Sequence, residues 1–209
     1  MIKDTIESQI IGVLKITDKE TGEILVQKRN AIHPGNMAYI MALALACLPS
    51  NLSPTTGTPC IGWMAFGNGG SSVDPTGVIT YLPPNTVGQN AGLYNETYAK
   101  VVDDNSAADT DPTTNYMSVL HTAGTVYTDI LVTCLLDYGE PPTQQAFDNS
   151  TNFNGEYVFD ELGLKSYSST GNSLLLTHVI FHPVQKSLNR LIQVDYTVRI
   201  QSLTGLAGV

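Results

Sequence analysis

Apolar and polar residues alternate most regularly near the C-terminal end of the chain. In the run 191–200, Ile192, Val194 and Tyr196 alternate with Gln193 and Asp195. A period of two predicts a strand with one buried face and one face toward water. Two further apolar runs, 157–164 and 174–181, are separated from it and from each other by Gly, Ser, Asn and Pro, so this third of the chain is expected to consist of strands.

The same pattern predicts strands in the rest of the chain. Runs 9–16 and 23–28 flank a segment with turn residues, Asp18, Thr21 and Gly22, and therefore predict a hairpin. Further strand-like runs cover residues 61–66, 116–121 and 126–138, and an element at 92–102 lies within a long polar region, 71–111.

One segment, 37–48, has helical rather than strand periodicity. Met37, Ile40, Met41 and Ala44 fall on one stripe, Asn36 is the expected N-cap, and Pro49 is expected to end the helix. The opposite side is also apolar, which predicts a helix covered on more than one side, by the sheets or by a neighbouring subunit.

These elements predict a mainly β fold: an antiparallel β-sandwich, jelly-roll-like, with one N-terminal helix and two long loops. Residues 1–209 are expected to form a single domain, with the hairpin and helix in 9–48 and the long loops in 67–115 and 139–155. Long irregular loops in a compact domain usually serve a function or rest on a partner, so contact with other subunits is expected there.

The charge pattern excludes several classes of function. Charged residues make up 14% of the chain, against about 25% in an average soluble domain, and the net charge is −9 with no basic run. Attraction to a nucleic-acid backbone is therefore not expected.

The longest apolar run has about a dozen residues, where a membrane span needs about 20. The start of the chain lacks a basic segment followed by a cleavage site, which predicts synthesis and retention in a cytoplasm.

Two carboxylate pairs are the strongest candidates for catalysis. Glycoside cleavage needs two carboxyl groups about 5–10 Å apart, and Asp160 with Glu161, or Glu96 with Asp129, could supply them. Adjacent residues in a strand point to opposite faces, however, and no G-x-S-x-G nucleophile elbow occurs. We therefore expect no catalytic residue and no enzymatic activity.

Other polar clusters could bind an ion or a phosphate, but each departs from the required pattern. The glycine-rich turn 67–70 has no following Lys-Ser/Thr, which favours a flexible turn over a phosphate cradle. The acidic cluster lacks the glycine and terminal glutamate of a calcium loop, which favours a solvated loop. This cluster consists of Asp103, Asp104, Asp109 and Asp111.

Histidines and cysteines are also too poorly spaced for a metal site. His178 and His182 lie on one face of a predicted strand but well apart. Cys47, Cys60 and Cys134 are an odd number without C-x-x-C spacing, so buried thiols are expected, with a bridge from Cys47 to Cys60 or between subunits left open. We expect no metal and no cofactor.

Tyrosines are frequent in and beside the predicted loops. Tyr94 and Tyr98 could anchor a protein interface or stack on a sugar, and interface anchoring is favoured because the single Trp63 lies in an apolar run.

Several segments together resemble a family of virion structural proteins of tailed bacteriophages. They are residues 11–46, FGNGG at 66–70, LYNETYAKVV at 93–102, and residues 159–200. The resemblance implies a β-sandwich subunit present in many copies, and it implies no catalytic residue.

The low charge favours a subunit whose exposed surface becomes contact surface, and the resemblance implies the kind of particle to which it belongs. The chain is expected to be a non-enzymatic virion protein on the outside of the particle, either a capsid decoration (cement) protein or a neck or collar protein. Its expected partners are copies of itself and capsid, neck or tail subunits, with no nucleic acid and no membrane. The alternative is a carbohydrate-binding tail fibre or baseplate module, for which a glycan would be the partner.

Overall fold

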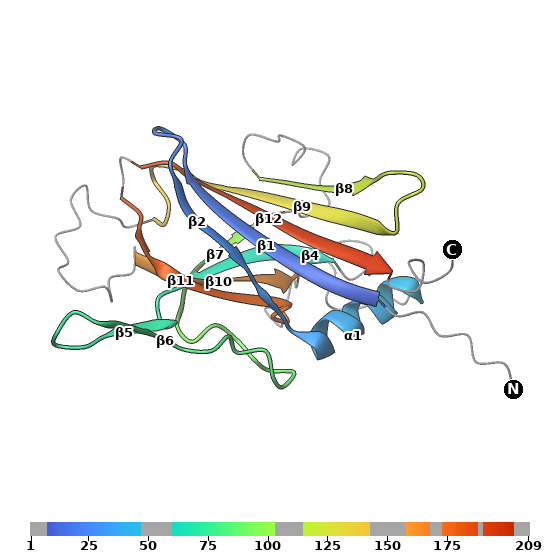
Figure 1. Cartoon of the computed structure of the whole chain (residues 1–209), viewed down its shortest axis with the longest axis horizontal. Coiled ribbons are helices and arrows are strands. Elements are labelled where there is room, and N and C mark those ends of the chain that lie inside the picture. The colour runs from blue at the N-terminus through green and yellow to red at the C-terminus, as the bar shows by residue number, and fades with distance from the viewer. Residues whose placement is uncertain are drawn as a thin grey trace, which may run out of the picture.

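Two five-stranded antiparallel sheets pack face to face (Figure 1). The structure is a computed structural model that describes residues 8–46, 60–102, 115–142, 158–167, 173–187 and 190–202. The first sheet has the order β2-β1-β12-β9-β8 and consists of β1 (Ser8–Asp18), β2 (Ile24–Arg29), β8 (Tyr116–His121), β9 (Tyr127–Leu136) and β12 (Ile192–Ser202). The second has the order β3-β11-β10-β4-β7 and consists of β3 (Ala31–Ile32), β4 (Ile61–Gly67), β7 (Glu96–Val101), β10 (Val158–Ser166) and β11 (Thr177–Gln185).

The first sheet follows the alternation in the sequence. β12 lies at its centre and pairs with β1 along its whole length, from Ser8 opposite Ser202 to Asp18 opposite Ile192. Ile192, Val194 and Tyr196 are buried, while the residues between them are half-buried on the outer face. The predicted strand and its buried face are confirmed.

The second sheet contains a strand that is buried on both faces. In β10 every residue except Lys165 is buried. Leu162 and Leu164 belong to the core between the sheets, together with Phe66 from β4 and Phe181 from β11. The outer face of this sheet is therefore also covered. The sequence did not predict this covering, because it shows no alternation of apolar and polar residues in β10.

The covering element is a segment that was expected to be a long loop. Within 67–115 the structure has a small hairpin, β5 (Ser71–Val73) and β6 (Ile79–Tyr81), followed by β7. Figure 1 shows β5 and β6 beneath the second sheet, on the side away from β1 and β12. The hairpin was missed because its strands have three residues each, too few to show a period.

The helix begins earlier than predicted. α1 (Pro34–Leu45) has His33 as its N-cap and Pro34 in its first turn, so the predicted start at Met37 with Asn36 as N-cap is wrong. Proline suits this position because the first turn has no partner for its missing N–H. The predicted end at residues 48–49 lies outside the described residues.

α1 closes one end of the sandwich, where Met37 and Ile40 are buried. Tyr39 on the other side and Leu45 in the last turn are 46% and 83% exposed, so the described residues cover the helix on one side.

The mainly β fold with antiparallel sheets and one helix is confirmed, and the jelly-roll connection stays a prediction. In the described part of the chain, no helix is both long enough and apolar enough to cross a membrane.

Candidate functional site

A buried cluster of polar side chains fixes the segment that covers the second sheet. We call residues 68–95 the clamped segment. Three side chains of β10 and β11 hold it: Asp160, Glu161 and His178, which are 2%, 0% and 0% exposed. Since a buried charge is tolerated only when it is paired or hydrogen-bonded, the partners of these groups define the site.

Asp160 holds the start of the clamped segment. Its carboxylate accepts hydrogen bonds from the backbone N–H of Gly70 (2.9 Å), the backbone N–H of Ser71 (2.7 Å) and the Ser71 hydroxyl (2.5 Å). Because the Gly-rich turn presents its N–H groups to a carboxylate of its own chain, it functions as an anion-binding turn that is already occupied. The turn was expected to be flexible, and these bonds show that it is held.

Glu161 joins the two ends of the clamped segment. Its Oε1 accepts from the backbone N–H of Gly69 (3.1 Å) and Asn95 (2.8 Å). Its Oε2 accepts from the backbone N–H of Tyr94 (2.9 Å) and from Nε2 of His178 (3.0 Å). One carboxylate thus binds four donors and closes the segment into a loop.

His178 holds the middle of the clamped segment. Its Nδ1 accepts a hydrogen bond from the backbone N–H of Asn85 at 2.8 Å, so the hydrogen of the neutral ring lies on Nε2, which donates to Glu161. The Asn85 amide then donates to the carbonyl of Gly92 at 3.1 Å. Both ring nitrogens of His178 are therefore hydrogen-bonded, one to Glu161 of β10 and the other to Asn85 of the clamped segment.

A second histidine holds the same segment from the helix end. His33 Nδ1 accepts from the backbone N–H of Asn36 (3.1 Å), and its Nε2 donates to the carbonyl of Gly88 (2.8 Å). The Asn36 amide donates to the carbonyls of Gln89 (3.3 Å) and Leu175 (2.8 Å). The side chains of His33 and Asn36 are both nearly fully buried, and their hydrogen bonds fix α1 to the clamped segment.

The two adjacent carboxylates have opposite pKa shifts. Burial raises the pKa of Asp160, and its bonds from Ser71 and Gly70 offset this only in part. Burial also acts to raise the pKa of Glu161, but the hydrogen bonds from His178 and from the backbone of Asn95, Tyr94 and Gly69 together lower it below its ordinary value. Glu161 is therefore stabilised as a carboxylate, as a clamp requires.

The surface of the clamped segment is almost uncharged. Asp74 is its one charged residue, in a chain where 14% of residues are charged. Its carboxylate accepts bonds from Thr76 and from the backbone of Val78, which lower its pKa and fix the hairpin tip. Of the thirteen large hydrophobic side chains exposed in the described residues, six lie in this segment: Val73, Val78, Tyr81, Leu82, Val87 and Tyr94.

A neutral, partly apolar surface of fixed shape is suited to contact with another macromolecule. The chain places buried charges beneath it, and these determine the shape of the surface without adding charge to it. We take the outer side of the clamped segment as the candidate functional site.

Of the two predicted carboxylate pairs, one lies together in the structure and the other does not. Asp160 and Glu161 were expected to point to opposite faces, yet both receive bonds from the turn 69–71, because the pairing register with β11 shifts between Phe159 and Glu161. Glu96 and Asp129 are not brought together. They lie in different sheets, and each forms its own ion pair, with Lys165 (3.0 Å) and Arg199 (2.7 Å).

The other predicted candidates are also placed by the structure. His178 is buried while His182 is exposed and contacts the Tyr81 hydroxyl, and no cluster of metal-binding side chains occurs among the described residues. The Cys134 thiol is buried, which raises its pKa to about 12. The acidic cluster 103–111, Cys47 and most of the loop 139–155 lie outside the described residues.

Sequence reasoning missed His33, Asn36 and Ser71 as members of the site. The Gly-rich turn was the available signal, because consecutive N–H groups need acceptors, but nothing in the sequence indicates that β10 supplies them.

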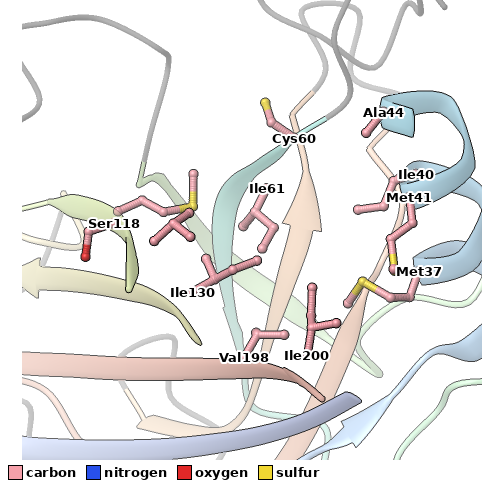
Figure 2. Close-up of a pocket in the computed structure, with 12 residues that line it drawn as sticks. Met37, Ile40, Met41, Ala44, Cys60, Ile61, Ser118, Ile130, Val198 and Ile200 are labelled. Carbon is pink, nitrogen blue, oxygen red and sulfur yellow. The ribbon is translucent and has the colours of Figure 1, made fainter. Parts of the chain in front are cut away.

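An apolar groove of about 300 Å³ lies at the helix end of the sandwich. Figure 2 shows Met37, Met41 and Ile40 of α1 facing Ile130, Val198 and Ile200 of the first sheet across it. Met117, Ser118 and Val119 of β8 complete the wall on the side of the sheet edge.

Comparisons with protein-family models, with curated proteins and with solved structures found no match to this chain.

Proposed function

We propose that this chain is a non-enzymatic structural protein on the outside of a tailed-bacteriophage virion, present in many copies. A capsid decoration (cement) protein is favoured and a neck or collar protein comes next. As cement it would bridge neighbouring capsid subunits and resist the pressure of the packaged DNA. The proposed partners are copies of itself and capsid, neck or tail subunits.

One observation carries this proposal: a long exposed segment with one charged residue is held in a fixed shape by a buried network. Fixing a surface before binding removes much of the entropy lost on binding. Because both carboxylates of the network are hydrogen-bonded by donors of the same chain, they support a positioning role. Many modest contacts of this kind hold firmly when copies are arrayed on one particle.

The test is capture of the purified protein by unexpanded shells, expanded shells and isolated neck and tail complexes, measured by co-sedimentation. Val87, 85% exposed within the clamped segment, is changed to Asp, and Ile24, 51% exposed on β2, is changed to Asp as the matched control. We expect stoichiometric capture that V87D abolishes and I24D preserves. Failure of every particle to capture the wild-type protein would refute the proposal.

A carbohydrate-binding tail fibre or baseplate module is the second candidate. Tyr98 does not serve it, because this ring packs against Phe66 with centroids 6.1 Å apart. Tyr39 does favour it, since this exposed ring lies beside a hollow of about 520 Å³ lined by polar Thr86 and Gln89. Glycan-array binding that is lost in Tyr39→Ala would support this candidate, and an array without signal would remove it.

A further inference from the structure

Among the described residues the two sheets have four edge strands, and three of these are protected against pairing with another strand. β2 carries Lys28 and Arg29, and β7 carries Glu96 and Lys100. Both also show a register shift against their neighbour, and β3 has two residues. Short length, charge and irregular register are the usual means of preventing edge-to-edge association.

β8 has none of these features. Its sequence YMSVLH contains no Asp, Glu, Lys or Arg and no proline. It pairs with β9 in unbroken register from Tyr116 opposite Thr133 to His121 opposite Thr128. No strand among the described residues pairs with its other edge, and Figure 1 shows β8 at the margin of the first sheet.

Apolar side chains flank the free edge on both faces of the sheet. Val119 and Leu120 are consecutive, so they point to opposite faces, and they are 64% and 54% exposed. Val119 also borders the apolar groove at the helix end of the sandwich. A strand added at this edge would gain backbone hydrogen bonds and apolar contacts together.

We infer that β8 pairs antiparallel with β8 of a second copy of this chain, so that the first sheet continues across a twofold axis. Antiparallel pairing of a strand with itself meets the symmetry of a closed dimer, since the same residues meet on both sides. Charge favours this edge as well. Each chain has a net charge of −9, and β8 lets two copies meet along a strand that has no Asp, Glu, Lys or Arg.

The expected affinity is modest. A six-residue strand is about 20 Å long, so the contact is small beside the roughly 1,200–2,000 Å² of a standard stable interface. We expect a dimer that dissociates on dilution, with a Kd of about 1–100 μM. The inference does not depend on the proposed function, because it concerns the purified protein alone.

The test is sedimentation equilibrium over a concentration series, with Leu120→Lys as the disrupting variant. Ile24→Lys is the matched control, because Ile24 is 51% exposed at the opposite edge of the same sheet. We expect L120K to raise the Kd at least about tenfold by placing a hydrated charge from each copy at the joined edge, and I24K to leave it unchanged. Both variants should keep the wild-type unfolding midpoint, because both side chains are exposed.

Hydrogen exchange provides a second readout on the wild-type protein. Amides of β8 should exchange more slowly as the concentration rises through the Kd, while those of β2 should not change. A wild-type protein that remains monomeric at about 200 μM would overturn the inference. So would a dimer that both lysine variants weaken equally.

Discussion

Glu161→Gln is the substitution that tests the clamp most sharply. The two side chains have nearly the same shape, so the change keeps the packing and replaces one acceptor oxygen with a donor NH₂ group. In the native protein Oε1 faces the N–H groups of Gly69 and Asn95, and Oε2 faces those of Tyr94 and His178. Whichever way the new amide turns, its NH₂ group faces two donors.

The expected loss of stability follows from the number of donors that this change leaves without an acceptor. If the NH₂ group faces Tyr94 and His178, the Tyr94 amide loses its acceptor. His178 can move its hydrogen to Nδ1, but the Asn85 N–H then loses its acceptor instead. Two buried donors stay unpaired in each arrangement, at about 1–3 kcal/mol each, so we expect a loss of about 2–6 kcal/mol.

Urea unfolding followed by circular dichroism measures this loss, and limited proteolysis reports on the clamped segment. Glu96→Gln is the control, because it removes one carboxylate charge from a partly exposed ion pair with Lys165 in the same sheet. That change should cost about 1 kcal/mol or less. A loss below about 1 kcal/mol for E161Q, with no new cleavage between residues 68 and 95, would refute the clamp.

Three further predictions concern the rest of the molecule. Burial lowers the pKa of Lys186 to about 8 from 10.5, so its charge destabilises the fold fully below pH 8 and not at all above pH 10.5. Lys186→Met should therefore raise the free energy of unfolding at pH 7 by about 1–3 kcal/mol, and a gain that persists at pH 11 would contradict this cause. The Arg190 guanidinium lowers the pKa of Asp18 to about 2 from 3.8, so this carboxylate contributes fully above pH 3.8 and loses its contribution as the pH falls toward 2. In Asp18→Asn the free energy of unfolding should lack this part of its dependence on pH. If that free energy changed with pH equally in the two proteins, the ion pair would not be the cause. A methyl group on Gly163 would lie 2.6 Å from the backbone oxygen of Thr177, so Gly163→Ala should cost about 1–3 kcal/mol in urea. Gly139→Ala, whose methyl group meets nothing within 4 Å, should be neutral, and equal effects of the two would disprove the steric account.

The sequence was informative where one face of an element is buried and the other is exposed. The alternation in β12 predicted both the strand and its buried residues, and the turn residues predicted the hairpin of β1 and β2. The start of α1 was misplaced because Asn36 is a favoured N-cap residue, although Pro34 is equally suited to a first helical turn.

The site could not be predicted from the sequence because it depends on contacts between distant parts of the chain. Asp160 and Glu161 were identified as candidates, but their shared orientation depends on a register shift against β11. Their donors in the clamped segment lie 66 to 92 residues away in the chain. Adjacent carboxylates are compatible with a catalytic pair or a clamp, and only the identity of their partners distinguishes the two.

The central claim is that the exposed clamped segment has a fixed shape before any partner binds. Hydrogen exchange of the isolated wild-type protein tests it directly, at the amides of Gly69, Asn85, Tyr94 and Asn95. We predict protection comparable to that of the amides within β10 and β11, because buried side chains hold all four. Exchange of these amides at the rate of an unstructured chain would contradict the account.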